Sequence, residues 1–230
     1  MIGEATINIE KDKVIDINKK KIKSKIVYLC IKRLMDIVLS IIGFVFLIPI
    51  IIIIKFVYII NKDKDTIFFK QKRIGLNGKE FELYKFRTMI VNADEVLLKM
   101  ISENEKIKKE YQYNKKLVDD PRITKIGKIL RRTSLDELPQ LLNIIKGNMS
   151  FIGNRPYLPR EKEDMKGFYK DIIKTKPALS GLWQVSGRSS LGFKERLKLE
   201  KYYSNHYSFK MDVKIFFKTI YVVFKKGGAI

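Results

Sequence analysis

The chain has 230 residues, 47 Lys and Arg against 25 Asp and Glu, and a formal net charge of +22. Hydrophobic residues make up 46% of it, which excludes a disordered polar chain and a collagen-like chain. The single cysteine, Cys30, excludes an intrachain disulfide framework and a cysteine-based zinc site, and favours a reducing compartment. The charge is compatible with any anionic partner, including lipid headgroups and nucleotide phosphates. It is weak evidence for nucleic acid, and without a zinc-finger spacing, an aromatic RNA-binding motif or a basic zipper we expect no nucleic acid partner.

The N-terminal third contains the most apolar part of the chain. Residues 1–25 are charged and without strong periodicity, so we expect an irregular lead. Residues 37–60 carry one charge, Lys55, and at ~1.5 Å per residue they are long enough for a bilayer core of ~30 Å. This favours a membrane segment over a buried core helix. Basic residues flank it on both sides and Pro49 lies inside it, which leaves open a re-entrant hairpin or a kinked crossing helix.

Residues 66–89 predict a β-hairpin. An Asn77-Gly78 pair separates two β-rich runs, which indicates a type I′ turn. A period of two in the second run places Lys85 and Arg87 on one face, so that two cations project side by side. The polar stretch that follows, residues 92–111, predicts a helix.

Residues 120–156 hold the densest group of chemically distinctive side chains. Ser134 and Glu137 have capping-box spacing ahead of an apolar run, although Pro139 also allows the regular helix to begin later. Either start places Asp136 and Glu137 near a helix N-terminus, where a phosphate is favoured and where Mg²⁺ can bridge it to a carboxylate. Neighbours on a helix point about 100° apart, so the two carboxylates are expected to have separate roles. The alternative is an ordinary solvated helix cap.

Arginine placement favours a phosphate site. In a chain with 37 lysines and ten arginines, an arginine beside a candidate motif indicates a need for its planar fork. We therefore expect that lysine at such positions lowers activity, whereas Arg160→Lys does not. The positions are Arg87, Arg131, Arg132, Arg155 and Arg188.

The C-terminal residues 209–224 predict an amphipathic helix, with Phe and Ile at helical spacing opposite lysines at intervals of four. A helix of this kind lies in a membrane interface or packs on a protein core, and the residues leave both arrangements open.

Four segments together resemble the bacterial sugar transferases, the monotopic phosphoglycosyl transferases also called polyprenyl-phosphate hexose-1-phosphate transferases. The resemblance covers residues 27–224, and its most specific block is SLDELPQL. The segments are KRLMD (32–36), FFKQKRIGLNGKEFELYKFRTM (68–89), DPRITKIGKILRRTSLDELPQLLNIIKGNMSFIGNRP (120–156) and SGLWQVSGR (180–188).

The resemblance implies transfer of a sugar-1-phosphate from a UDP-sugar to undecaprenyl phosphate, with release of UMP, at the start of surface glycan assembly. It implies a covalent phospho-sugar intermediate on Asp136, with Glu137 beside it as the second catalytic residue, and Mg²⁺ as cofactor with Asp136 as its ligand. It also implies a re-entrant segment broken near Pro49. The substrate-binding residues that we expect are Lys85, Arg87, Arg132, Arg155, Pro156, Arg188 and Glu200.

Two positions depart from the family pattern. Asn154 stands where the family usually has the first proline of Pro-Arg-Pro, and Glu200 stands where it commonly has aspartate. An extra methylene at Glu200 keeps the charge but moves it.

The sequence therefore predicts an α+β protein of the cytoplasmic membrane, with its catalytic domain on the cytoplasmic face. We expect a lead (1–25), a re-entrant membrane helix (26–61), and a catalytic domain (62–230) with a β-hairpin, mainly helices and interfacial amphipathic helices. Partners are the UDP-sugar, undecaprenyl phosphate and membrane lipids; the sugar and the oligomeric state are not indicated. A non-catalytic basic membrane scaffold is the alternative.

Overall fold

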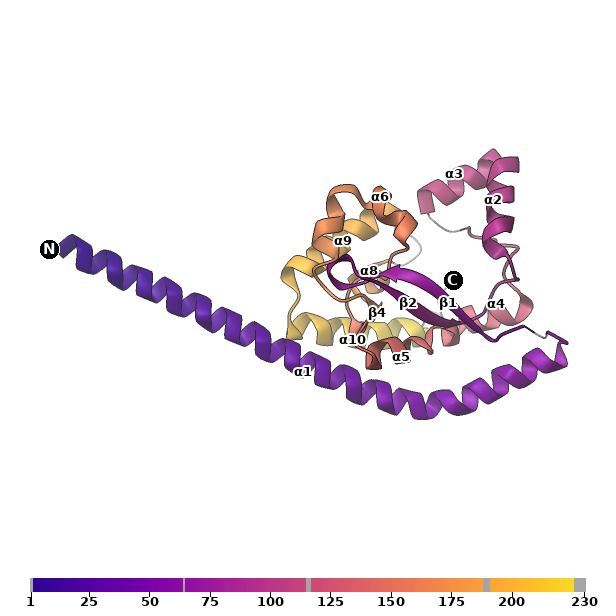
Figure 1. Cartoon of the computed structure of the whole chain (residues 1–230), viewed down its shortest axis with the longest axis horizontal. Coiled ribbons are helices and arrows are strands. Elements are labelled where there is room, and N and C mark those ends of the chain that lie inside the picture. Colours follow the sequence, from indigo (N-terminus) through magenta and orange to yellow (C-terminus); the bar gives the residue numbers. More distant parts are fainter. Residues whose placement is uncertain (1, 64, 115–116, 188–190, 226–230) are drawn as a thin grey trace.

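The structure, a computed structural model, combines helices with two small sheets, which confirms the mixed α and β class (Figure 1). The re-entrant path, the interfacial helices and the three-part division of the chain stay predictions. Backbone is described for residues 2–63, 65–114, 117–187 and 191–225, and side chains for residues 24–63, 65–113, 117–187 and 191–222.

Helix α1 (Ile2–Ile60) runs along one side of the molecule, and the other elements lie on its concave side (Figure 1). Its part from Ser24 is long and apolar enough to cross a membrane. The structure corrects two expectations. Residues 2–25 are helical rather than irregular, because a helix already nucleated by an apolar segment extends at little further cost. The helix also continues through Pro49 without a break, because a proline inside a helix removes only one of its hydrogen bonds, and α1 is curved along its length (Figure 1).

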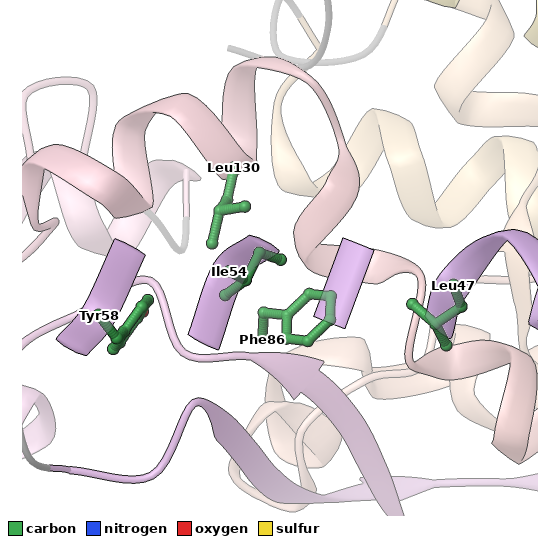
Figure 2. Close-up of a cluster of buried hydrophobic side chains, with 5 residues drawn as sticks. All are labelled: Leu47, Ile54, Tyr58, Phe86 and Leu130. Carbon is green, nitrogen blue, oxygen red and sulfur yellow. The ribbon is translucent and has the colours of Figure 1, made fainter. Parts of the chain in front are cut away.

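Packing on both sides of Pro49 holds the helix in place. Leu47, Ile54 and Tyr58 of α1 are buried against Phe86 and Leu130 from the body of the chain (Figure 2). Burial of such side chains contributes roughly 1.5–3 kcal/mol each. This cluster fixes the end of the apolar helix next to the elements that carry the candidate site.

Strands β1 (Phe68–Ile74) and β2 (Glu80–Phe86) form the expected antiparallel hairpin. Asn77 and Gly78 both have left-handed backbone, with φ of 55° and 81°, and the Lys79 amide donates across them to the Leu76 carbonyl at 3.2 Å. The pair therefore makes the turn that the sequence predicted, inside a connection of residues 75–79.

Helices α2 (Ala93–Glu103) and α3 (Glu105–Asn114) replace the single helix expected over residues 92–111. Asn104 between them has extended backbone, and its side-chain oxygen accepts hydrogen bonds from the second and third amides that follow. An asparagine that caps a new helix ends the previous one.

The remaining elements are mostly short and pack around the hairpin. Strands β3 (Ser150–Ile152) and β4 (Ala178–Ser180) are parallel. The helices are α4 (Lys125–Arg132), α5 (Gln140–Ile145), α6 (Lys162–Met165), α7 (Tyr169–Ile172), α8 (Leu182–Ser186), α9 (Phe193–His206) and α10 (Phe209–Lys225), with 3₁₀ turns at Leu76–Gly78, Leu135–Glu137, Pro159–Glu161 and Lys166–Phe168.

The KRLMD segment fastens α1 to this body. Arg33 donates to the last two carbonyls of α5 at 2.6 and 2.8 Å. Asp36 accepts from the Ser150 hydroxyl and from the next backbone amide, both at 3.0 Å. Lys32 forms an ion pair with Asp212 of α10. We call these four charged residues, Lys32, Arg33, Asp36 and Asp212, the clasp.

Candidate active site

A cleft of about 1680 Å³ opens between the hairpin, the α2–α3 pair and the C-terminal helices. Six of the expected site residues line it together: Lys85, Arg87, Arg132, Asp136, Glu137 and Arg155. The structure thus gathers side chains that are up to 70 positions apart in the sequence into one cavity. Pro156 and Glu200 do not line it, and Arg188 lies outside the described residues.

Asp136 and Glu137 lie in a 3₁₀ turn between α4 and α5. Ser134 has left-handed backbone, with φ of 58°, and makes no side-chain cap, so the capping box is absent. Helix α5 begins at Gln140, directly after Pro139, as the alternative start allowed. The proline fits this position because it needs no amide hydrogen bond there.

Lys85 connects both carboxylates. Its Nζ donates to Glu137 Oε1 at 2.9 Å and lies 3.8 Å from Asp136 Oδ2. The Asp136 side chain is 10% exposed, against 39% for Glu137. Both carboxylates of the dyad therefore line the cleft, and Asp136 is the more enclosed of the two.

Burial and nearby charges shift the pKa values of the two acids in opposite directions. Burial raises the pKa of Asp136 above its usual value, although Lys85 opposes this. Burial also acts to raise the pKa of Glu137, but Lys85, Arg155 and Arg73 together lower it below its usual value. The two neighbours thus have pKa values displaced in opposite directions, as paired groups with different roles often do.

Asn143 of α5 sets the position of the strand that carries Lys85. Its Oδ1 accepts from the Tyr84 amide at 3.0 Å, and its Nδ2 donates to the Glu82 carbonyl at 2.6 Å. The side chain is fully buried. It occupies the place of a third strand beside β2, and sequence reasoning missed it because nothing in the sequence pairs residues 82 and 143.

Helix α4 brings two arginines to the edge of the dyad. A Cβ at Gly127 would lie 1.9 Å from the Thr88 carbonyl oxygen, so only glycine lets α4 approach this closely. Arg131 consequently reaches the Thr88 hydroxyl, to which its Nε donates at 3.0 Å. Burial lowers the pKa of Arg131, and Asp136 opposes this. Arg132, the next residue, is exposed at the cleft.

Arg87 has a different environment from Lys85, which corrects the expectation that the two cations project together. Strand β2 ends at Phe86, so the period of two does not continue to Arg87. The guanidinium pairs with Asp63 at 2.7 Å, donates to the Thr66 carbonyl at 2.8 Å and lies over the Tyr58 ring. These contacts tie the end of α1 to the hairpin, and phosphate binding by Arg87 stays a prediction.

Arg155 reaches the cleft from the loop after β3. Its guanidinium carbon lies 5.8 Å from the centre of the Trp183 ring, and its backbone amide donates to Glu200 Oε1 at 2.8 Å. Burial acts to lower the pKa of Arg155, but Glu161, Tyr157 and Glu200 raise it above its usual value. Glu200 is fully buried behind the loop, and burial raises its pKa to about 8. Glu200 therefore supports the Arg155 loop from its buried side, and its expected contact with substrate stays a prediction.

Asn154, the departure from Pro-Arg-Pro, faces away from the cleft. Its Nδ2 lies within hydrogen-bond distance of the Ile172 carbonyl, Thr175 Oγ1 and Ser204 Oγ, at 3.0, 3.0 and 2.6 Å. The amide side chain thus joins the loop to the neighbouring helices. Arg155 keeps its place in the cleft beside it.

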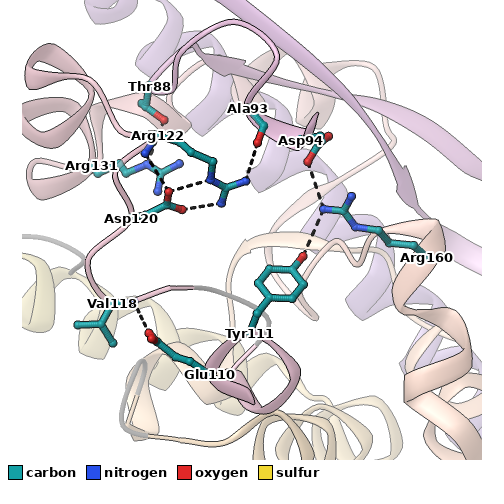
Figure 3. Close-up of polar contacts among 10 residues, drawn as sticks. All are labelled: Thr88, Ala93, Asp94, Glu110, Tyr111, Val118, Asp120, Arg122, Arg131 and Arg160. Atoms are coloured by element: carbon teal, nitrogen blue, oxygen red, sulfur yellow. Dashed lines mark hydrogen bonds and ion pairs between the residues drawn. The ribbon is translucent and has the colours of Figure 1, made fainter. Parts of the chain in front are cut away.

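A second arginine pair builds the far wall of the cleft (Figure 3). Arg122 pairs with Asp120 at 2.5 Å, and donates to the Ala93 carbonyl at the start of α2 at 3.0 Å. Arg160 pairs with Asp94 at 3.5 Å and lies 3.4 Å from the Tyr111 hydroxyl. These contacts connect α2 and α3 to the rest of the cleft, and the sequence did not indicate them.

A family model described as bacterial sugar transferase matches residues 27–226. The chain belongs to the bacterial sugar transferase family. The resemblance carried by the four sequence segments is thereby confirmed, and the matched region includes the dyad, Lys85 and the Arg155 loop.

Curated members of the bacterial sugar transferase family are similar over most of this chain. The undecaprenyl-phosphate galactose phosphotransferase of Salmonella typhimurium and the UDP-galactose-lipid carrier transferase of Erwinia amylovora are each 38% identical, over 86% of this chain and 41% of their own length. The exopolysaccharide production protein ExoY of Sinorhizobium fredii is 38% identical over 86% of this chain and 87% of its own length. These names are those of transferases and a polysaccharide production protein, which agrees with the expected enzyme class. The chain spans less than half the length of the first two relatives.

The donor set for a metal is small in this family member. No group of three or more His, Cys, Asp or Glu side chains is gathered among the described residues. Mg²⁺ is commonly held by one or two carboxylates, with waters and substrate phosphates completing its shell. Asp136 and Glu137 therefore fit an ion shared with a phosphorylated substrate, rather than one caged by the protein.

Proposed function

We propose that this protein is a membrane-bound phosphoglycosyl transferase that moves a sugar-1-phosphate from a UDP-sugar to undecaprenyl phosphate and releases UMP. The observation that carries the proposal is the cleft in which Asp136 and Glu137 share Lys85 and face arginines, in a chain of this family. The names of the relatives from Salmonella and Erwinia support the acceptor and the nucleotide. ExoY supports a role in exopolysaccharide production.

The proposed chemistry has two steps. An Asp136 carboxylate oxygen bonds to the phosphorus that carries the sugar, and the bond from that phosphorus to the bridging oxygen breaks, so UMP leaves with the electron pair. A phosphate oxygen of undecaprenyl phosphate then attacks the same phosphorus, and the carboxylate leaves. Covalent catalysis of this kind divides one difficult transfer into two easier ones.

Lys85 keeps the dyad ready for this reaction. It lowers the pKa of Asp136 against the effect of burial, and so increases the ionised fraction that can attack. It also neutralises Glu137, which would otherwise repel the diphosphate. We propose that Asp136 and Glu137 hold Mg²⁺ together with the substrate, where the ion would supply positive charge toward the phosphate oxygens.

The location that we propose is the cytoplasmic membrane, with the cleft on its cytoplasmic face. Support comes from α1, whose exposed side chains between Ile37 and Ile60 are almost all apolar, and from α10, where Phe217 is 64% exposed. A helix that is apolar toward solvent is stable when lipid covers it.

The test is an assay of UMP release by the full chain in nanodiscs, with a panel of UDP-sugars, undecaprenyl phosphate and Mg²⁺. We expect release with at least one sugar, dependent on the acceptor for turnover. Silence across the whole panel would favour the non-catalytic scaffold. DNA or RNA binding that survives removal of the apolar segment would indicate a different class of protein.

A further inference from the structure

Basic side chains from separate elements meet at the C-terminal end of α5, apart from the residues that line the cleft. Gly147 follows α5 and has left-handed backbone, with φ of 84°. A Cβ at this glycine would lie 3.5 Å from Arg33 Nη2 of α1 and 3.9 Å from Lys176 Nζ, in the segment before β4. Both cationic groups therefore border the same point beside the turn.

Tyr84 of β2 connects this pair of cations to the hairpin. Lys146, the residue before Gly147, donates from Nζ to the Tyr84 hydroxyl at 2.8 Å, and the same Nζ lies 4.7 Å from the centre of the ring. Lys70 Nζ of β1 lies 5.7 Å from that ring centre. We call Arg33, Lys70, Lys146 and Lys176 the basic patch.

The basic patch has little acidic charge to balance it. Among the described residues, the one carboxylate within ion-pair distance of the patch is that of Glu82, 4.0 Å from Lys70 Nζ, and both of these side chains are more than half exposed. Burial, and then the charge of Arg33, lowers the pKa of Lys176, although Asp36 opposes this. Cations that are held together against their mutual repulsion favour an anion beside them.

Capping of α5 accounts for Arg33 but not for the three lysines. The carbonyls at the end of a helix attract cations, and Arg33 donates to the last two carbonyls of α5. Lys146 and Lys70 are directed to the Tyr84 ring instead. An ammonium group has three N–H donors, so the bond from Lys146 to the hydroxyl leaves it able to bind a second acceptor.

The proposed membrane would reach the basic patch. Leu34 and Met35, which follow Arg33 on α1, are 63% and 44% exposed, so lipid would cover them while Arg33 contacts α5. Helix α5 packs on α1 on one side and on β2 on the other (Figure 1). The patch therefore lies where the lipid-facing side of α1 meets the body of the protein. Phospholipid phosphates lie at such a boundary, and basic and tyrosine side chains are typical of it.

We propose that the basic patch binds the headgroup phosphate of one anionic phospholipid, with Tyr84 as a positioning residue for Lys146. The inference rests on the proposed membrane location and adds to it a lipid that is bound without being transformed. An anionic headgroup suits the patch better than a zwitterionic one, because four positive charges repel the cation that a zwitterionic headgroup carries.

The experiment titrates the full chain in detergent with short-chain phosphatidylglycerol and, separately, with phosphatidylcholine of the same acyl length. Native mass spectrometry counts the bound lipids. We expect the wild type to bind one phosphatidylglycerol in preference to phosphatidylcholine. Lys146→Gln/Lys176→Gln should weaken phosphatidylglycerol binding by about fivefold for each lysine removed, and leave phosphatidylcholine binding within about twofold.

Two matched variants separate a defined site from general attraction to a charged lipid. Lys210→Gln/Lys214→Gln removes the same charge from exposed positions of α10 and should bind phosphatidylglycerol as the wild type does. Lys146→Arg/Lys176→Arg keeps the charge and should keep the preference. If the double glutamine variant does not fold, each of its single substitutions tests the same preference.

Equal affinity of the wild type for the two lipids, or an unchanged affinity of Lys146→Gln/Lys176→Gln for phosphatidylglycerol, would overturn the inference. Glycerol 3-phosphate that binds as tightly as the lipid would also overturn it, because the patch would then serve a soluble phosphate. Failure of the proposed function is distinct: phosphatidylglycerol would bind at the patch, yet no UDP-sugar would be consumed.

Discussion

Lys85 Nζ and Glu137 Oε1 lie 2.9 Å apart, and this contact places one ammonium group over both acids of the dyad. The pair joins the edge of the hairpin to the turn that follows α4, so the electrostatics of the site depend on how β2 and α5 are packed. Several consequences of this arrangement can be measured.

Replacing Lys85 by methionine should move the acid limb of the kcat/KM profile to higher pH. The ammonium lowers the pKa of Asp136, so its removal raises that pKa and leaves less carboxylate to attack at a given pH. We expect a rate at neutral pH lower by about tenfold or more. Lys128→Met, at an exposed lysine of the same cleft, serves as the control. An acid limb that stays in place would contradict the role given to Lys85.

Asn143→Ala should lower both stability and activity. The substitution leaves the Tyr84 amide and the Glu82 carbonyl without their partner, and each such buried group costs about 1–3 kcal/mol. Asn143→Asp should rescue only in part, because a carboxylate accepts from Tyr84 but does not donate to Glu82. Thermal unfolding in nanodiscs measures the effect, with the exposed Asn61→Ala as control. A wild-type melting temperature for Asn143→Ala would show that the hydrogen bonds of Asn143 with β2 contribute little to stability.

Asp212→Asn should loosen α1 from the body of the protein. Asp212 pairs with Lys32 and accepts from the hydroxyls of Tyr28 and Tyr203, at 2.6 and 2.7 Å. Removing one charge of an enclosed pair costs roughly 3–5 kcal/mol. Limited proteolysis between α1 and β1 should accelerate as a result. Glu103→Gln removes an exposed pair with Lys99 and should change the free energy of unfolding by less than about 1 kcal/mol. Equal proteolysis of both variants would show that the clasp contributes little.

Glu200→Gln should flatten the dependence of stability on pH. In the folded protein the pKa of Glu200 is raised from 4.5 to about 8, so folding takes up a proton between these values. The free energy of unfolding therefore falls as pH rises from about 4.5 to about 8, and levels off above that. Glutamine keeps an acceptor for the Arg155 amide and has no charge to bury. Melting temperatures of both proteins across pH 5–9 should show a smaller slope for the variant; identical slopes would exclude Glu200 as the source.

The local patterns of the sequence predicted a large part of the fold. The apolar run, the Asn77-Gly78 turn and the helix at the C-terminus all follow from neighbouring residues, and the structure has each of them. The dyad and Lys85 also meet as expected, although their meeting was anticipated from family resemblance and not from spacing.

What the sequence did not predict depends on contacts between distant segments. Residues at least 59 positions apart are joined by the hydrogen bonds of Asn143 with β2, by the clasp and by the Arg73–Pro156 contact. Arg87 pairs with Asp63 and does not project beside Lys85, because β2 ends at Phe86 and the alternation of side chains holds only within a strand. Asn154, which departs from the family pattern, likewise makes hydrogen bonds inside the protein that its position in the sequence did not indicate.

The most direct test of the account is mass spectrometry of the full chain incubated with the UDP-sugar that it uses, Mg²⁺ and no acceptor. We predict a phospho-sugar adduct on the peptide that contains Asp136, its loss when undecaprenyl phosphate is added, and its absence from Asp136→Asn. An adduct on Asp136→Asn, or full transfer by that variant, would contradict the assignment of Asp136 as the nucleophile.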